Sequence, residues 1–160
     1  MKTVKSLLIP TVVGFAILST GAIAGKEDKL TEQQVPKAVL ETFHKAYPQA
    51  LDLKYEKEEE AGKPAYEVEF TDQGVKREAT YAADGKLLKT EEGIDPAALP
   101  ANVAEAVKKA YPQATIKEAE KKFKADGTFK AYEVELKDGK KELEICLDEA
   151  GKILKTKVEH

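Results

Sequence analysis

Glutamates that alternate with apolar residues are the most distinctive chemical feature of this chain. They occur in two similar stretches, Ala65–Phe70 (AYEVEF) and Ala131–Leu136 (AYEVEL). If these stretches are strands, their carboxylates lie together on one face of a sheet and could bind a partner protein. A solvated face that only keeps the sheet soluble is the alternative. The charged side chains that we expect to form this partner-binding face are Glu67, Glu69, Lys76, Glu78, Glu133, Glu135, Glu142 and Glu144.

The other reactive side chains argue against catalysis and against a metal centre. Both serines, Ser6 and Ser19, lie in a leader-like segment at the N-terminus, and the two histidines are His44 and His160. A zinc site needs three or four histidine, cysteine or carboxylate ligands at close spacing. No nucleophile and base can be paired from the remaining residues. We therefore expect no catalytic residue, no metal centre and no cofactor.

A run of mostly acidic residues, Glu56–Glu60 (EKEEE), suggests a second kind of binding, that of cations. Hard cations such as calcium prefer several oxygen ligands, so the alternative function is a periplasmic cation-binding or stress-buffering acidic protein. The run lacks the D-x-D-x-D-G pattern of a shaped calcium loop, and an exposed charged hairpin is the simpler interpretation. The matching stretch in the second half of the chain is basic, with Lys121, Lys122 and Lys124.

The single cysteine, Cys146, has no partner for an internal disulfide. It lies between Ile145 and Leu147, which we expect to face the helices, so strand alternation predicts its thiol on the charged face. Glu142 and Glu144 share that face, and neighbouring carboxylates raise the pKa of a thiol and slow its reaction. We therefore expect a monomer rather than a disulfide-linked dimer.

The N-terminal segment, residues 1–24, has the layout of a secretory signal peptide. Lys2 and Lys5 precede a mostly apolar stretch at residues 7–18, and Ala22–Ala24 (AIA) is a small-x-small cleavage site. An uncleaved membrane anchor is the alternative, but the apolar stretch is shorter than the roughly 20 residues that span a bilayer. We expect export to the periplasm or the medium, with no membrane span after cleavage.

The composition of the chain after this segment narrows the class of partner. The whole chain carries 26 basic and 29 acidic side chains, and two of the basic ones, Lys2 and Lys5, belong to the predicted signal peptide. Residues 25–160 are therefore more acidic than the whole, Arg77 is their single arginine, and they contain no basic tract. Such a chain is a poor nucleic-acid binder. The expected partner is an unidentified protein of the envelope or the medium.

The chain repeats itself, which indicates a duplication. KAYPQA occurs at Lys45–Ala50 and again at Lys109–Ala114. Further downstream a short insertion shifts the alignment, so that Lys86–Thr90 (KLLKT) matches Lys152–Thr156 (KILKT). We therefore divide the chain into a signal peptide at 1–24, a first copy at 25–92 and a second copy at 93–160.

Each copy predicts one helix followed by an antiparallel meander of four strands. Apolar residues recur at helical spacing before each KAYPQA, and Pro48 or Pro112 ends the helix. Period-two alternation then predicts the strands, with Tyr66 and Tyr132 toward the helices. The expected fold is α+β, with one continuous eight-stranded sheet, both helices on one face and a shared core. Two independent units joined at Glu91–Asp95 are the alternative.

The order of these motifs resembles the PepSY-like, β-lactamase-inhibitor-like domains, in two tandem copies. The resemblance rests on the Tyr-Pro pair that ends each helix, on the Tyr-x-Val strands and on DGKLLKT at Asp84–Thr90. It implies a small exported, non-catalytic domain that binds or inhibits a protein through the open face of its sheet. The inhibitor that gives the family its description grips its enzyme with a concave eight-stranded sheet.

Overall fold

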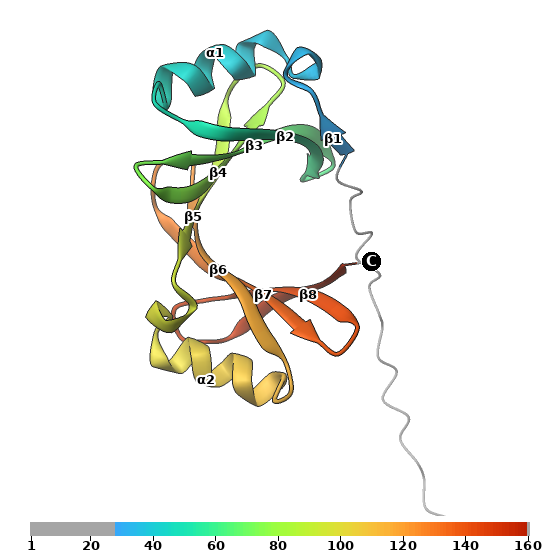
Figure 1. Ribbon diagram of the computed structural model, residues 1–160, viewed down its shortest axis with the longest axis vertical. Helices are drawn as coiled ribbons and strands as arrows, with labels where there is room; N and C mark the ends of the chain where they lie inside the picture. The colour runs from blue at the N-terminus through green and yellow to red at the C-terminus, as the bar shows by residue number, and fades with distance from the viewer. Residues whose placement is uncertain (1–27, 160) are drawn as a thin grey trace, which may run out of the picture.

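The computed structural model describes residues 28–159, which form one antiparallel sheet with two helices against its convex face (Figure 1). The predicted signal peptide lies outside the described residues. Within them, neither helix is long and apolar enough to cross a membrane. The elements are β1 (Asp28–Leu30), the 3₁₀ turn η1 (Glu32–Gln34), α1 (Lys37–Ala46), β2 (Leu51–Glu60), β3 (Lys63–Asp72), β4 (Val75–Ala82), β5 (Leu87–Ile94), η2 (Pro96–Ala98), α2 (Ala101–Ala110), β6 (Thr115–Lys124), β7 (Phe129–Asp138), β8 (Lys141–Leu147) and β9 (Ile153–Glu159).

The sheet is continuous, as the sequence predicts, because every strand pairs antiparallel with the next one along the chain. It has nine strands rather than eight. The additional strand is β1, which pairs with Tyr55–Lys57 of β2. This strand at the N-terminal edge is too short for a period-two pattern to reveal it.

Both helices form and end where the sequence predicts. α1 follows Pro36, and its last residue precedes Tyr47, whose backbone has left the helical region (φ −128°, ψ 67°) because Pro48 comes next. α2 repeats this arrangement between Pro100 and Tyr111. Each helix turns two fully or nearly fully buried apolar side chains onto the sheet, one turn apart.

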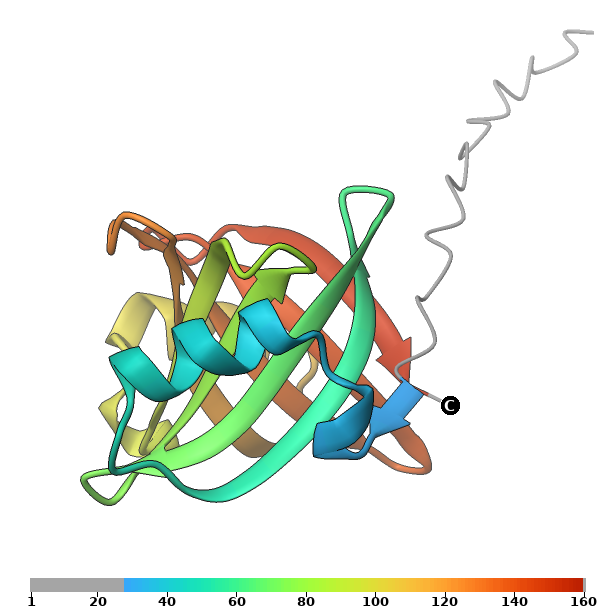
Figure 2. The same cartoon turned by 90° about the horizontal axis from the view of Figure 1, so that it is seen from above.

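The two helices cover separate apolar clusters, so the expectation of a shared core is wrong. One cluster centres on Val39 and Phe43 of α1, and the other on Val103 and Val107 of α2. The sheet curls strongly, which places α1 and α2 on opposite outer sides of the molecule (Figures 1 and 2). The two copies therefore share a sheet but not a core. Tyr132 is buried as predicted.

Tyr66, the counterpart of Tyr132, is only partly buried at the margin of the first cluster. The strand phase is nevertheless right, because Val68 and Phe70 on the same face are almost completely buried.

β5 joins the two copies and belongs to both. It pairs with β4 on one side and with β6 on the other. The predicted boundary between residues 92 and 93 falls inside this strand. The second half of β5 corresponds to β1 in the repeat, since Asp28 lies opposite Lys57 just as Glu92 lies opposite Lys121. One strand thus ends the first copy and begins the second.

A tight turn in each copy packs directly on the helix of that copy. Gly85 and Gly151 have φ of +83° and +80°, and a Cβ at either position would lie 2.5 or 2.6 Å from a helix carbonyl oxygen, of Ala38 or Asn102. Such an approach is too close for any side chain. The Nδ2 of Asn102 also donates a hydrogen bond to the carbonyl oxygen of Glu149 at 2.6 Å. These contacts fix each helix against the strands that follow it.

Candidate functional site

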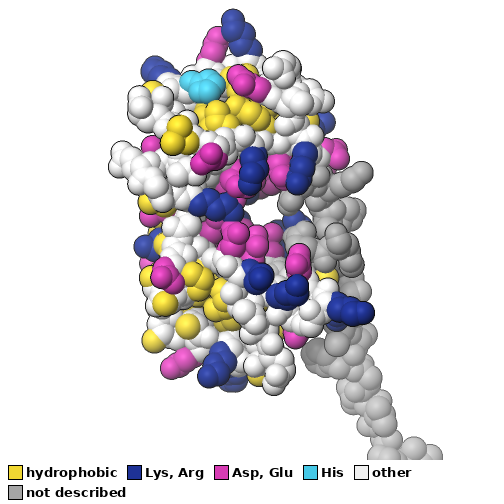
Figure 3. All heavy atoms as spheres, viewed as in Figure 1, with side chains coloured by type: hydrophobic (Ala, Val, Ile, Leu, Met, Phe, Trp, Pro, Cys, Tyr) yellow, Lys and Arg dark blue, Asp and Glu magenta, His cyan; other side chains and the backbone are white. Residues whose placement is uncertain are grey.

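The concave face of the sheet encloses a charged hollow of about 790 Å³. The space-filling view shows carboxylates and ammonium groups gathered around its opening (Figure 3). Twelve glutamates and six lysines line it, so its formal charge is strongly negative. The glutamates are Glu56, Glu58, Glu59, Glu60, Glu67, Glu69, Glu78, Glu91, Glu120, Glu133, Glu135 and Glu144, and the lysines are Lys76, Lys89, Lys122, Lys130, Lys155 and Lys157.

Strand alternation and curvature together bring these side chains inward. Seven of the eight residues that the sequence assigns to the charged face line the hollow. The exception is Glu142, which is exposed beside the β7–β8 turn and lies outside it. The face is also less open than expected, because the sheet curls until β2 and β9 line the same space. The acidic run at Glu56–Glu60, interpreted as an exposed hairpin, likewise contributes to the lining.

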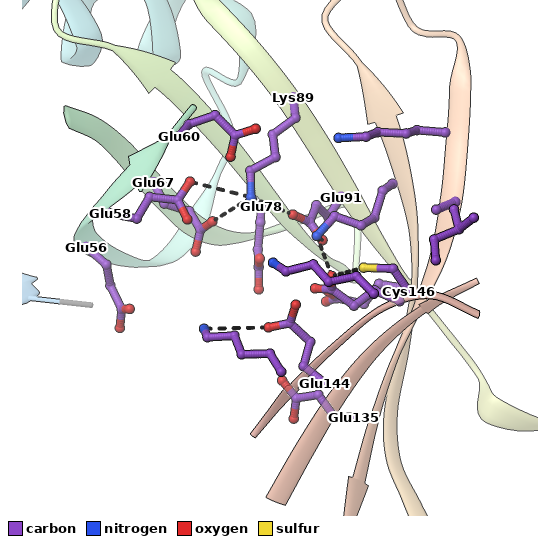
Figure 4. A pocket seen from close by; sticks show the side chains of 18 of the residues that line it. Glu56, Glu58, Glu60, Glu67, Glu78, Lys89, Glu91, Glu135, Glu144 and Cys146 are labelled. Carbon is purple, nitrogen blue, oxygen red and sulfur yellow. Dashed lines mark hydrogen bonds and ion pairs between the residues drawn. The ribbon is translucent and has the colours of Figure 1, made fainter. Parts of the chain in front are cut away.

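Glu91 of β5 is the centre of the ion-pair network in the hollow (Figure 4). Its residue is only 2% exposed. The ammonium group of Lys89 lies 3.1 Å from Oε1 of Glu91, and that of Lys122 lies 3.1 Å from Oε2. Lys122 also donates a short hydrogen bond to Glu133 on β7. The central strand thus links the charged groups of both copies.

Lys89 extends the network into the first copy. Its ammonium group lies 3.4 Å from Oε1 of Glu58 and 3.7 Å from Oε2 of Glu67. Thr80 donates a hydrogen bond of 3.2 Å to the same Glu67 oxygen. Because Glu91 is its third partner, Lys89 contacts carboxylates on three strands.

Lys76 of β4 contacts a second group of carboxylates, one on β4 and two on β6, so its side chain reaches across β5. Its ammonium group lies 2.6 Å from Glu118, 3.7 Å from Glu78 and 3.9 Å from Glu120. Gly93 of β5 lies close beside Lys76, since a Cβ there would lie 3.3 Å from the Cβ and from the carbonyl oxygen of Lys76.

The carboxylates of the hollow outnumber its lysines. Burial makes it unfavourable for all of these carboxyl groups to be ionised at once. Burial, with the charges of neighbouring glutamates, raises the pKa of Glu67 and of Glu120 to about 7. Burial, with Glu67 and Glu120 nearby, raises the pKa of Glu78 to about 10. Glu78 therefore holds a proton at neutral pH, and a cationic group that enters the hollow would find carboxylates ready to ionise.

The two central lysines remain charged. Burial alone would lower the pKa of Lys89 and of Lys122, but the adjacent carboxylates outweigh it, Glu91 foremost, and raise both pKa values. Oxygens of Glu67, Glu78 and Glu91 lie within 4.8 Å of one another, as do those of Glu91, Glu120 and Glu133. Each of these two groups of oxygens already contacts one of the lysine ammonium groups.

Cys146 lies on the charged face, as the sequence predicts, and lines the hollow. Its Sγ donates a hydrogen bond of 3.0 Å to Oε2 of Glu133. Burial, together with the negative charge of Glu133, raises the pKa of the thiol to about 12. The main shielding carboxylate is Glu133 on the neighbouring strand; Glu144, one of the two expected, also raises the pKa of the thiol, whereas Glu142 does not contribute.

Sequence reasoning missed the residues at the centre of the hollow, namely Lys89, Glu91, Glu120 and Lys122. They lie on β5 and β6, where charged side chains occur on both faces and no clean alternation marks a strand. The signal that could have found them is the duplication. Aligning the end of one copy with the start of the next would have placed β5 beside β6.

Two family models match the chain. The family described as "Putative beta-lactamase-inhibitor-like, PepSY-like" matches residues 64–155, more than half of the chain. The family described as "Peptidase propeptide and YPEB domain" matches residues 29–91. No curated protein matches the chain.

Solved structures from Bacteroides species share the fold. A "putative periplasmic" protein of Bacteroides eggerthii aligns with a TM-score of 0.61 at 13% identity, over 78% of this chain and 88% of that one. A DUF2874 family protein of Bacteroides ovatus gives 0.57 at 17% identity, over 77% and 86%. A BLIP-like protein of Bacteroides fragilis gives 0.54 at 22% identity, over 76% and 84%. Together with the family match and the repeated helix-plus-meander architecture, these findings show that the chain belongs to the PepSY-like, β-lactamase-inhibitor-like family.

Proposed function

We propose that this protein is an exported, non-catalytic binding module that captures a basic segment of another protein in its glutamate-rich hollow. The observation that carries the proposal is the hollow itself, with twelve glutamates against six lysines on a concave surface. Opposite charges steer a partner toward such a surface and select it over neutral or acidic competitors.

The state of the carboxylates supports a cationic ligand. Burial, with the negative charges of three nearby glutamates, raises the pKa of Glu78 to about 10, although the ammonium group of Lys76 lies 3.7 Å from its carboxylate. A lysine or arginine side chain from a partner would replace the proton there with a charge-assisted hydrogen bond, which is stronger than a neutral one. The family description, an inhibitor-like module, supports binding rather than catalysis.

Export is part of the proposal. The N-terminal sequence has the layout of a signal peptide. The similar Bacteroides eggerthii protein is described as periplasmic. Inhibition of a protein partner remains one form that capture could take, with the partner's identity to be found by experiment.

The experiment is a titration of the protein, residues 25–160, with a synthetic peptide of alternating lysine and valine, followed by calorimetry. We expect saturable binding that weakens steeply as salt is added, because the attraction is screened. An otherwise identical peptide with glutamate in place of lysine is expected not to bind. A pull-down from the native envelope with the same protein then identifies the natural partner.

Matched variants distinguish the hollow from a general charge effect. Glu69→Lys with Glu135→Lys reverses two charges in the hollow, and Glu41→Lys with Glu105→Lys reverses two on the exposed faces of α1 and α2. Both change the net charge equally. The first pair should weaken peptide binding by about tenfold or more, and the second should change it little. Equal weakening by the two pairs would contradict the proposal.

Cation binding is the second candidate, favoured by the two groups of carboxylate oxygens within 4.8 Å. Calcium titrated in the same calorimeter separates the two. A saturable, stoichiometric response to calcium, with no response to the lysine peptide, would favour this candidate over a protein partner.

A further inference from the structure

Lys76 holds its ammonium group among three carboxylates of the hollow, and its contacts with them are unequal. The group donates a hydrogen bond of 2.6 Å to Oε2 of Glu118, but it lies 3.7 Å from Oε1 of Glu78 and 3.9 Å from Oε1 of Glu120. The two longer distances exceed those of hydrogen bonds. One ammonium group thus lies near three carboxylates and gives a hydrogen bond to only one of them.

Glu120 shows that this position can hold a cation more closely than it holds Lys76. The residue is only 8% exposed, and its Oε1 is buried and accepts no hydrogen bond from the described residues. Lys76 is the only cation within 4 Å of this oxygen among residues 28–159. Because a buried carboxylate without hydrogen bonds is unfavourable, an ammonium group at hydrogen-bond distance from Glu120 would be stabilised there.

The surroundings of this position favour a positively charged group. Burial alone would lower the pKa of Lys76, but the hydrogen bond to Glu118 and the charges of neighbouring glutamates outweigh burial and raise the pKa. Burial and neighbouring glutamates also raise the pKa of Glu78 to about 10, although Lys76 lies nearby. The position therefore keeps an ammonium group charged, and Lys76 alone does not supply enough positive charge to keep Glu78 ionised at neutral pH.

Lys76 differs from the two central lysines in its exposure. Its side chain is 37% exposed, compared with 12% for Lys89 and 11% for Lys122. The side chain of Glu118, which accepts its hydrogen bond, is 46% exposed. Ion pairs that are exposed to this extent contribute little to stability, because water competes for both groups. Of these three lysines, Lys76 is therefore the one whose ammonium group leaves its position most easily.

The duplication shows that the fold does not require a cation at this position. The alignment that matches Lys86–Thr90 with Lys152–Thr156 places Lys76 of β4 at Glu142 of β8. The second copy thus forms the equivalent strand with a glutamate, which is exposed and lies outside the lining of the hollow. The needs of the strand meander therefore do not account for Lys76.

We infer that the ammonium group of Lys76 occupies the position that a lysine of the captured basic segment takes, and that this lysine displaces it; the inference rests on the proposed function. The incoming ammonium group donates hydrogen bonds to Glu78 and Glu120, while Lys76 turns toward solvent. The ligand of this position is a primary ammonium group on an unbranched chain, as Lys76 itself is. Lys76 is thus an internal competitor of the partner and weakens its capture.

Removal of the Lys76 side chain tests the position without a peptide. The part of the side chain that Lys76→Ala removes has the structure of n-propylammonium. In the exported chain, n-propylammonium chloride should raise the melting temperature of this variant by about 3 °C or more above the value in equimolar sodium chloride. The unmodified protein should respond equally to the two salts, and adding Glu120→Gln to the variant should abolish the difference. Equal responses of Lys76→Ala to the two salts would overturn the inference.

Peptide binding tests the displacement. Lys76→Gln and Lys130→Gln each remove a positive charge from the lining of the hollow, and Lys130 is exposed. We expect Lys76→Gln to bind the lysine–valine peptide at least about threefold more tightly than Lys130→Gln does, since the control measures the effect of net charge alone. Lys76→Arg keeps the charge and should gain no affinity.

The outcomes separate this inference from the proposed function. Equal affinities of the two glutamine variants, with the peptide still bound by the unmodified protein, would overturn displacement and leave capture of a basic segment intact. Absence of peptide binding in every variant would overturn both. If Lys76→Ala does not fold, the comparison of Lys76→Gln with Lys130→Gln decides alone.

Discussion

Cys146 carries a thiol whose reactivity is lowered by its burial and by Glu133, which lies opposite it on β7. Its Sγ lies 3.0 Å from Glu133, and half-burial removes the water that would stabilise a thiolate. The same environment keeps Glu78 protonated at neutral pH. The protonation state of a side chain in the hollow therefore depends on its burial and its charged neighbours as well as on its residue type.

The thiol should react slowly in the folded protein. Because its pKa lies near 12, only a very small fraction is thiolate at pH 8. We expect iodoacetamide to alkylate the native protein at least about tenfold more slowly than the protein unfolded in urea. Glu133→Gln should speed alkylation of the native protein, because it removes the charge that opposes ionisation. Equal rates in the native and unfolded states would show that the thiol does not lie beside Glu133.

The strands differ in how far their sequences reveal them. β3 and β7 alternate strictly, so Glu67 and Glu133 could be assigned to the charged face from sequence alone. β5 carries Glu91 and Glu92 in succession, one turned into the hollow and one paired with Arg77 outside it. Periodicity cannot separate such neighbours. The curl of the sheet, which turns a face into a hollow, depends on all nine strands together and leaves no local signal.

The turns that hold the helices make a prediction at the scale of elements. Gly85→Ala and Gly151→Ala each combine an unfavourable positive φ with a clash of the new Cβ against a helix carbonyl. We expect each to lower the free energy of unfolding by about 3 kcal/mol or more, as measured by urea denaturation.

Gly127→Ala is the matched control for the two turns. Gly127 has a φ of +80°, but no atom lies within 4 Å of the position that a Cβ would take. The alanine should therefore cost only about 1–2 kcal/mol, the conformational part of the effect. If the three variants lose equal stability, the turns do not fix the helices by close packing.

The charge excess of the hollow should make the whole molecule more stable in mild acid. A carboxyl group whose pKa is higher in the folded state stabilises fully below its unfolded pKa of 4.5 and loses that contribution as the pH rises toward its folded value. The stabilisation from protonated Glu67 and Glu120 is lost by about pH 7, and that from protonated Glu78 by about pH 10. The melting temperature should therefore fall by roughly 5 °C or more between pH 5 and pH 9.

Glu78→Gln tests the origin of this pH dependence. An amide cannot ionise, so the variant should lose less stability between pH 5 and pH 9 than the unmodified protein does. Glu105→Gln, on the exposed face of α2, should leave the dependence as it is. A melting temperature that rises with pH, or an unchanged slope in Glu78→Gln, would contradict the assignment.

The strand shared by the two copies also bears on their ancestry. If one ancestral copy once assembled as a pair, the junction now formed by β5 and β6 had to form between identical partners. In the present chain that symmetry is lost. Two first halves would set Glu91 against Glu58, and two second halves would set Lys157 against Lys122, each a repulsion. Fragments 28–94 and 95–160, produced separately, should therefore complement each other as a heterodimer in size-exclusion chromatography and fail to pair with themselves. Each half of the chain is therefore expected to pair with the other half and not with a second copy of itself.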